Sequence, residues 1–186
     1  IRQLKINLTL EITDENTLVF VESGLVTKKL NELSENPIKI SSIESLFYIH
    51  RHLFKEIYIW AGEKRTVEIS KEGKQFFPTI NFESAFQYIN SLIIEFKEIN
   101  NNDSIKLSEK LAEILDNVNY LHPFREGNGR VQREFIRLLA LEKGLILNLN
   151  PIDKPSVYER YMKGTINSDV KVLSKLIFEL IEKLEK

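Results

Sequence analysis

The amino-acid sequence predicts an all-α fold with one β-hairpin. Apolar residues recur at helical spacing in successive segments from residue 43 onwards. The spacing of apolar residues changes once, at residues 66–70, where polar and apolar side chains alternate as they do in a strand. A chain of 186 residues is long enough to bury one core, and it shows no internal repeat or interdomain linker. We therefore expect a single domain over residues 1–186.

The first long helix is predicted by a capping signature. Residues 41–44 read Ser-Ser-Ile-Glu, a pattern in which a hydroxyl and a carboxylate satisfy the free amides of a helix start. The apolar residues that follow carry this helix towards Trp60, and Gly62 can take the left-handed conformation that closes it. His50 and His52 fall inside this helix, and we assign both to the fold rather than to chemistry.

The hairpin is expected over residues 66–77. Its strands are residues 66–70 and the apolar run 75–77, and Lys71-Glu72-Gly73-Lys74 supplies the turn between them. Pro78 ends the second strand, because proline has no N–H to donate to a ladder.

The remaining segments repeat the helical period. Further helices are expected to begin at a cap formed by Asn81 or Ser84, at Ser108, at Asn128, near Lys154 and near Ser168. Gly144 is placed to end the helix that begins at Asn128, and the last helix is expected to run to residue 186. Helices thus flank the central part of the chain at both ends.

Composition narrows the functional classes. A net charge of -1 gives no overall field that would attract nucleic acid or an anionic membrane, so neither is expected as a partner. The absence of cysteine excludes disulfides, thiolate metal sites and a cysteine nucleophile. No stretch of the sequence has the length and apolarity of a membrane span or a signal peptide, so we expect the protein in the cytoplasm.

Anion-binding groups concentrate in residues 122–133, between two apolar helices. Gly127-Asn128-Gly129 at a helix start lets backbone N–H groups converge on an anion, where the helix dipole also favours phosphate. Arg130 and Arg133 lie three residues apart and therefore share one helix face beside this cradle. Two guanidinium groups there suit a polyphosphate better than a single carboxylate.

Two other residues of the segment can supply chemistry. Glu126 is a hard oxygen ligand of the kind that Mg²⁺ takes together with substrate phosphates. His122 titrates near neutrality and can accept a proton from an attacking hydroxyl. A base, a metal ligand and a phosphate cradle together indicate phosphoryl or nucleotidyl transfer, although each alone is more often an ordinary structural feature.

The same segment resembles the signature of the Fic family. Residues 122–133 match the pattern His-x-Phe-x-(Asp/Glu)-Gly-Asn-Gly-Arg-x-x-Arg at every fixed position. Residues 54–65, Phe-Lys-Glu-Ile-Tyr-Ile-Trp-Ala-Gly-Glu-Lys-Arg, look like the segment before the hairpin in Fic domains. The resemblance covers about residues 40–150 and implies a Fic-type helical bundle with a β-hairpin flap.

The resemblance also implies a reaction and a role for each motif residue. Fic enzymes transfer AMP from ATP to a hydroxyl of a target protein, so His122 is implied as the catalytic base and Glu126 as the Mg²⁺ ligand. Gly127, Asn128 and Gly129 are implied as the anion hole for the phosphates, with Arg130 and Arg133 gripping them. Phe124 is implied as the structural anchor of the loop.

The hairpin resembles the Fic flap, which pairs with an extended segment of the target protein. The implied target-binding residues are Lys71, Glu72, Gly73, Lys74, Gln75, Phe76 and Phe77. An ordinary hairpin with Phe76 and Phe77 as core anchors is the structural alternative. Tyr158 and Tyr161 are candidates for lining an adenine pocket.

Regulation is expected from another protein. Many Fic enzymes are inhibited by a helix with the pattern (Ser/Thr)-x-x-x-Glu-(Gly/Asn), and no glutamate of this sequence satisfies it. A separate antitoxin that packs near Arg130, as in the bacterial toxin-type members, is therefore the expected partner. A segment upstream of Ile1 is the alternative place for that helix. For such a toxin, DNA gyrase and topoisomerase IV are candidate targets by analogy.

Three other functions remain open at this point. The same fold could transfer UMP, phosphocholine or phosphate, although the intact Gly127-Asn128-Gly129 favours AMP. A non-enzymatic module that only binds a nucleotide or a partner would keep its effect after His122→Ala. A DNA-binding protein of the helix-turn-helix kind, which the arginines in residues 130–137 could suggest, is disfavoured. The near-zero net charge of the chain gives little driving force for DNA binding.

Overall fold

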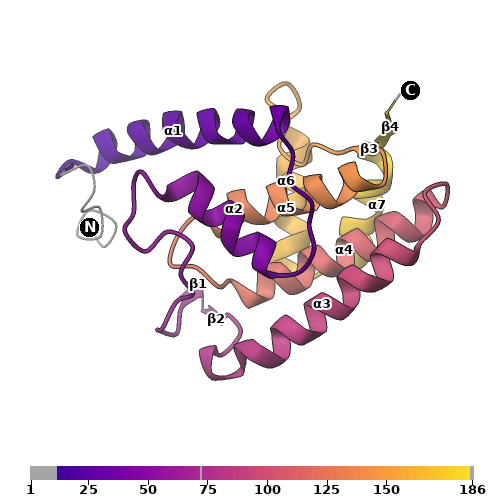
Figure 1. The fold of residues 1–186 in the computed structure, drawn as a ribbon, viewed down its shortest axis with the longest axis horizontal. Helices are drawn as coiled ribbons and strands as arrows, with labels where there is room; N and C mark the ends of the chain where they lie inside the picture. Colours follow the sequence, from indigo (N-terminus) through magenta and orange to yellow (C-terminus); the bar gives the residue numbers. More distant parts are fainter. Residues whose placement is uncertain (1–11, 72, 185–186) are drawn as a thin grey trace.

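A computed structural model describes residues 12–71 and 73–184 of the chain. Its helices are α1 (Glu15–Glu35), α2 (Glu44–Phe54), α3 (Phe82–Glu98), α4 (Ser104–Leu121), α5 (Asn128–Glu142), α6 (Pro155–Asn167) and α7 (Val170–Leu180), with a short 3₁₀ turn, η1 (Thr79–Asn81). Its strands are β1 (Ser70–Lys71), β2 (Lys74–Gln75), β3 (Leu145–Ile146) and β4 (Glu182–Lys183). The described residues thus form the predicted helical fold with a small amount of strand (Figure 1).

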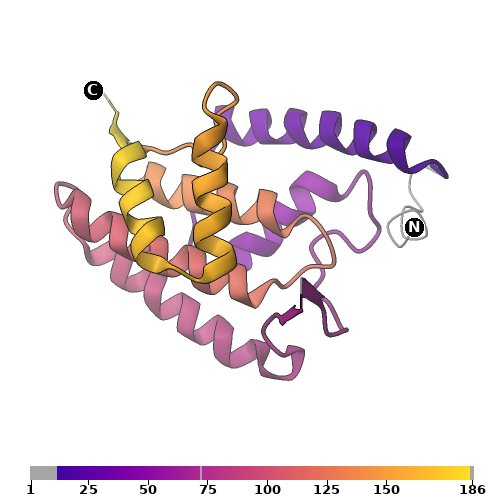
Figure 2. The same ribbon diagram turned by 180° about the vertical axis from the view of Figure 1, so that it is seen from behind.

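Helix α4 is the centre of the bundle. It packs against α3, α5 and α7, while α2 lies on α5 and α6 lies on α7 (Figures 1 and 2). Apolar residues of α4 at helical spacing, among them Leu111, Leu115 and Val118, are buried in the shared core. The core thereby fixes both the end of α4 and the start of α5, which are joined by residues 122–127.

Helix α1 is held more loosely. It lies along one side of the molecule against α2 (Figure 1), and of its 21 residues only Leu18, Val26 and Leu33 are buried. Phe20 on its outer face is 81% exposed. Asp14 caps its start by accepting a hydrogen bond from the backbone N–H of Thr17.

The structure corrects the prediction for the first long helix. Helix α2 ends at Phe54 rather than near Trp60, because the chain leaves the helix through turns closed by the Phe54 carbonyl. The predicted capping box is absent from this helix start, where the N–H of Ser41 donates instead to Ser45 Oγ. Gly62 does adopt a positive φ of 84°, but in a turn after the helix has ended.

Two predicted caps were also wrong. Helix α4 is capped by Asp103, whose side chain accepts from the N–H of Lys106, and Ser108 lies inside the helix with its hydroxyl bonded to the Ser104 carbonyl. Asn81 precedes α3 without a side-chain cap bond. The predictions for α5, which begins at Asn128, were confirmed.

The strands are shorter than predicted. In the hairpin Ser70 pairs with Gln75 and Lys71 with Lys74, so Lys71 and Lys74 are strand residues rather than turn residues. The alternation over residues 66–70 therefore reflects an extended approach to the hairpin more than a paired strand. A second pairing, β3 with β4, was not predicted, and it follows an α7 that ends at Leu180 rather than residue 186.

The described helices give no support for membrane insertion. Among residues 12–71 and 73–184, no helix combines the length and the apolarity that a bilayer crossing needs.

Candidate active site

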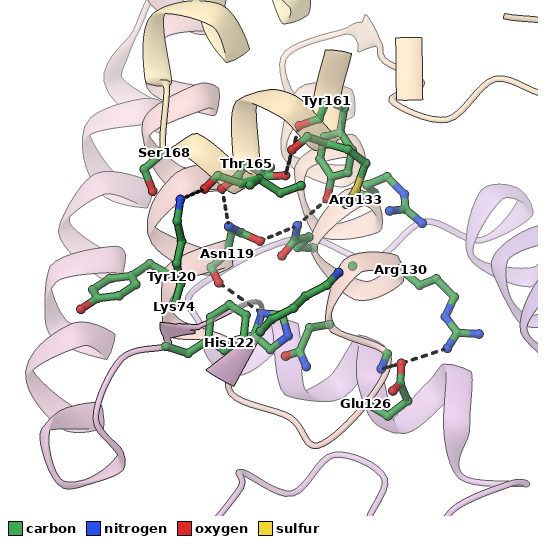
Figure 3. A pocket seen from close by; sticks show the side chains of 18 of the residues that line it. Lys74, Asn119, Tyr120, His122, Glu126, Arg130, Arg133, Tyr161, Thr165 and Ser168 are labelled. Atoms are coloured by element: carbon green, nitrogen blue, oxygen red, sulfur yellow. Dashed lines mark hydrogen bonds and ion pairs between the residues drawn. The ribbon is translucent and has the colours of Figure 1, made fainter. Parts of the chain in front are cut away.

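A pocket of about 820 Å³ lies where the hairpin, the end of α4, the start of α5 and α6 meet (Figure 3). Most residues of the predicted motif line it, including His122, Glu126, Arg130 and Arg133. Five cations contribute to its wall: Lys71, Lys74, Arg125, Arg130 and Arg133. A pocket of this size and charge matches an anionic ligand with several phosphate groups.

His122 caps the C-terminal end of α4 in an unusual backbone conformation. Its φ of 44° and ψ of 60° are left-handed, which costs a non-glycine residue about 1 kcal/mol or more. Its ring nitrogen Nδ1 lies 3.2 Å from the carbonyl of Asn119, which can only accept a hydrogen bond. This contact assigns the proton to Nδ1 and leaves Nε2 as the acceptor.

Burial controls the charge of this imidazole. Removal from water, with a smaller contribution from the Arg65 and Lys71 cations, lowers the pKa of His122 from 6.5 to about 4, against the opposing effects of Asn119 and Glu126. The ring of Phe76 stacks on the imidazole at 3.7 Å between centroids. His122 is therefore neutral at physiological pH and can accept a proton, which corrects the expectation from the sequence that it titrates near neutrality.

The loop after His122 is held by buried side chains. Phe124 is fully buried, as expected for the anchor of the motif, and stacks on His50 at 3.9 Å. The side chain of Asn128 accepts from the Phe124 N–H at 3.0 Å and donates to the Phe124 carbonyl at 2.8 Å. Asn128 thus uses its side chain to fold the loop, and only its backbone N–H is left to face an anion at the helix start.

His50 supports the loop from the other side. Its Nδ1 accepts from the N–H of Gly62 at 2.8 Å, so its Nε2 carries the proton and donates to the Glu126 carbonyl at 3.1 Å. Burial lowers the pKa of His50 to about 4, which keeps the ring neutral. His50 therefore has a structural role, as predicted, and links α2 to the motif loop.

The start of α5 requires a glycine. Gly127 has a φ of 80°, and a Cβ there would lie 2.5 Å from the ring of Phe54. The first backbone N–H groups of α5 lack acceptors within the helix and face the pocket that Gly127, Asn128 and Gly129 line. The three residues are thus arranged as an anion-binding helix N-terminus.

We predict that Gly127→Ala lowers the free energy of unfolding by about 3 kcal/mol, because the added methyl group meets Phe54 and the backbone is left-handed. Urea denaturation measures this change. Gly144→Ala is the matched control, since Gly144 has a φ of 73° but nothing within 4 Å of the added Cβ. Equal losses in the two variants would contradict the role given to Phe54.

The charged residues of the motif meet different partners. Glu126 Oε1 accepts from the Gly127 N–H at 2.9 Å and lies 3.8 Å from Arg130. Arg130 forms a close ion pair with Glu22 of α1 at 2.5 Å. Arg133 lies over the rings of Tyr158 and Tyr161, at 5.3 and 5.4 Å. The pairing with Glu22 was not predicted, because Glu22 is followed by Ser23 and so lies outside the inhibitory pattern.

The hairpin contributes to the pocket in two ways. Lys71, Lys74, Gln75 and Phe76 line it, and Lys74 Nζ donates to the Ile166 carbonyl at the end of α6 (Figure 3). Phe77 instead packs edge-on against Tyr120, and its N–H donates to the Tyr120 carbonyl. Of the other flap residues, Gly73 forms the turn with a φ of 80°, and Glu72 lies outside the described residues.

Several residues of the pocket were missed by sequence reasoning. Asn119 holds both His122 and the carbonyl of Thr165, and Gln132 donates to Tyr161. Tyr158 and Tyr161 do line the pocket, as the candidates for an adenine site. The signal for Asn119 was available, because it lies one turn before His122 on the same helix.

Metal ligands do not cluster in the described part of the chain. Residues 12–71 and 73–184 contain no group of three or more His, Cys, Asp or Glu side chains that could hold an ion. Glu126 remains a single carboxylate at the pocket wall, with 38% of its side chain exposed. One carboxylate fits Mg²⁺ that takes its other ligands from phosphates and water.

Comparisons with known proteins match the same region. A family model described as Fic/DOC family matches residues 40–140. The chain is 32% identical over 146 residues to protein adenylyltransferase VbhT of Bartonella schoenbuchensis, covering 78% of this chain and 30% of that protein. It is 29% identical over 149 residues to probable protein adenylyltransferase Fic of Escherichia coli, covering 76% of this chain and 70% of that one. The chain thus corresponds to less than a third of VbhT.

Solved structures share the fold. The N-terminal Fic domain of a putative cell filamentation protein from Bartonella quintana, with bound ADP, superposes with a TM-score of 0.82 at 18% identity, over 95% of this chain and 90% of that one. BepC from Bartonella tribocorum, with bound AMPPNP, has a TM-score of 0.79 at 18% identity, over 94% and 91% of the two chains. The helical bundle with its hairpin is therefore the fold of these proteins.

Proposed function

Since this chain belongs to the Fic/DOC family, we propose that it is a protein adenylyltransferase, which moves AMP from ATP to a hydroxyl of a target protein. The observation that carries the proposal is a neutral, half-buried imidazole, His122, in one pocket with a glycine-rich helix start and two arginines. The names of the relatives, which are protein adenylyltransferases, support the same activity.

The proposed reaction is a single displacement. The target hydroxyl oxygen attacks the α-phosphorus of ATP and forms a new P–O bond, while the bond to the bridging oxygen breaks and pyrophosphate leaves. The hydroxyl proton passes to Nε2 of His122, which is the free acceptor because Nδ1 faces the Asn119 carbonyl. Asn119 thereby holds the imidazole in the tautomer that the reaction needs.

The helix start and the arginines would bind the nucleotide. The N–H groups of Asn128 and Gly129, joined by that of Gly127 when it leaves Glu126 Oε1, would stabilise the charge on the phosphates, and Arg130 and Arg133 would bind the outer phosphates. Bound ADP and AMPPNP in two neighbours of the same fold support ATP as the co-substrate. Glu126 would hold Mg²⁺, which neutralises phosphate charge when it is bound.

The target protein would dock on the hairpin. Ser70, Lys71, Lys74 and Gln75 are exposed, and among the described residues β1 and β2 pair with each other alone, so an extended segment could add to the edge of this sheet. Phe76 stacks on His122 directly after these residues, which supports docking of such a segment near the proposed base. DNA gyrase and topoisomerase IV are the first purified targets to test.

The position of the label in ATP tests the reaction class. Protein is incubated with Mg²⁺, candidate targets and ATP labelled at either the α- or the γ-phosphate. Adenylyl transfer labels the target from α-labelled ATP alone, whereas a kinase labels it from the γ position alone. UTP and CDP-choline serve as alternative donors. Labelling from one of these, or from γ-labelled ATP, would overturn the proposal.

The charge of His122 makes a prediction about pH. Because its pKa is about 4 in the free protein, the rate of transfer should stay constant from about pH 8 down to about pH 5. An acid limb centred near 6.5 would show an ordinary, solvated imidazole instead. Circular dichroism at each pH is the control.

Both His50 and His122 have lowered pKa values, so the folded state loses stability as pH falls from 6.5 towards 4.

Glu22 supports a proposal about regulation. Its carboxylate forms an ion pair with Arg130, the cation that would otherwise bind phosphate. The Glu22 side chain is only 12% exposed. It also accepts a hydrogen bond from Tyr58, so α1 is fixed to the body at this point. We therefore propose that α1 restrains the site from within the chain. Inhibition by a separate antitoxin stays a prediction.

A further inference from the structure

Arg65 is a buried cation between the hairpin and the catalytic loop. Its guanidinium has no exposed surface and lies 5.0 Å from the centre of the Phe82 ring. A buried charge without polar partners would cost several kcal/mol. The partners of Arg65 therefore indicate which parts of the molecule this residue joins.

On one side Arg65 binds the end of α4 and the loop after it. Its Nε donates to the His122 carbonyl at 2.8 Å, and its backbone N–H donates to the Pro123 carbonyl at 2.7 Å. The carbonyls at a helix end lack partners within the helix. Arg65 supplies such a partner to His122, whose left-handed backbone needs to be held in place.

On the other side Arg65 binds both arms of the hairpin. One terminal nitrogen donates to the Val67 carbonyl at 2.8 Å, before β1, and the other to the Phe77 carbonyl at 2.5 Å, after β2. Glu68 accepts from the guanidinium at 3.2 Å and also from the N–H and hydroxyl of Thr79. A single side chain thus closes the base of the hairpin.

We propose that Arg65 is a positioning residue that fixes the hairpin and His122 relative to each other. Phe76, next to the Phe77 carbonyl that Arg65 binds, stacks on the imidazole at 3.7 Å. The same guanidinium therefore sets both the ring that covers the base and the backbone that carries the base. This inference rests on the proposed transfer, since it assigns Arg65 to the alignment of the target hydroxyl with Nε2.

The phosphate side of the pocket is held by different contacts. Asn128 ties Phe124 to the start of α5, and His50 ties Glu126 to α2. Arg65 makes none of these bonds. Loss of Arg65 therefore affects the transfer step to a protein target and leaves ATP binding in place.

Arg65→Lys tests the inference, because lysine keeps the charge but has one nitrogen and cannot reach both sides. The expected result is a fall of about 100-fold in kcat for transfer to the target, the scale of a 1 Å misplacement, with ATP affinity within about threefold of the original protein. Arg160→Lys is the matched control, since Arg160 is 43% exposed and pairs with Glu179 away from the pocket.

A spectroscopic measurement separates this inference from the proposed activity. The stacked Phe76 ring is expected to shift the NMR signals of the His122 imidazole protons upfield, and Arg65→Lys should remove that shift while core methyl signals stay in place. If lysine prevents folding, Glu68→Gln serves instead, with a smaller change in the same direction. An unchanged ring shift with unchanged kcat, or an equal loss of ATP affinity, would overturn the role of Arg65. Failure of the original protein to transfer AMP would overturn only the proposed reaction.

Discussion

His122→Ala should lower the rate of AMP transfer by about a thousandfold, within the range by which a positioned base accelerates proton transfer. The alanine variant keeps the phosphate cradle and both arginines, so its affinity for ATP should change little. Transfer of label from α-labelled ATP to the target measures the first quantity, and calorimetric titration with ATP measures the second. This pattern identifies a group that acts in the reaction step.

His52→Gln is the matched control for this experiment. His52 lies on α2, faces Glu32 of α1 at 3.3 Å and is absent from the pocket wall. Because this contact lies outside the pocket, its loss removes no group that the proposed reaction uses and cannot imitate the loss expected for His122→Ala. Full activity of the His122 variant would favour a module that binds nucleotide without transferring it.

Glu22→Gln is expected to strengthen ATP binding by tenfold or more. The substitution removes the carboxylate that holds Arg130 at 2.5 Å, and a charge-assisted hydrogen bond of the freed guanidinium to phosphate contributes about 1.5–3 kcal/mol. Glutamine has the same shape and still accepts the hydrogen bond from Tyr58. The dissociation constant for ATP and the rate of AMP transfer are the quantities to measure.

Glu35→Gln is the control on the same helix. Glu35 is exposed at the far end of α1, so it tests whether loss of any negative charge from this helix has the same effect. An unchanged dissociation constant in Glu22→Gln would mean that the ion pair with Arg130 does not compete with phosphate. The inhibitory role would then pass to another protein, as the sequence alone had suggested.

Much of the site could be predicted because its residues are contiguous. Residues 122–133 carry the base, the glycines and the arginines in one segment, and the local rules for helix ends place them at the junction of α4 and α5. The order of the helices from α2 onwards followed from apolar periodicity in the same way, whereas α1 was not predicted from it. The roles assigned to the motif residues stay predictions for the experiments above.

The long-range contacts could not be predicted. Arg65 looks like an ordinary charged residue after a turn, and only the fold brings the carbonyls of His122 and Phe77 to it. Glu22 likewise reaches Arg130 from a helix that precedes the family-matched region. The predicted helix ends were wrong for a related reason. The turns after Phe54 and the cap by Asp103 depend on which nearby polar group bonds to the free backbone groups at the helix end.

The few buried side chains of α1 give the protein a response to temperature. A helix with three buried residues and a few polar contacts, among them the pair of Glu22 with Arg130, is expected to separate from the body at a lower free energy than global unfolding. If α1 restrains the site as proposed, the fraction of molecules with α1 detached would set the resting rate. That fraction would rise on warming together with the rate constant of the reaction itself. We therefore expect the resting rate of the original protein to climb more steeply with temperature than that of Glu22→Gln.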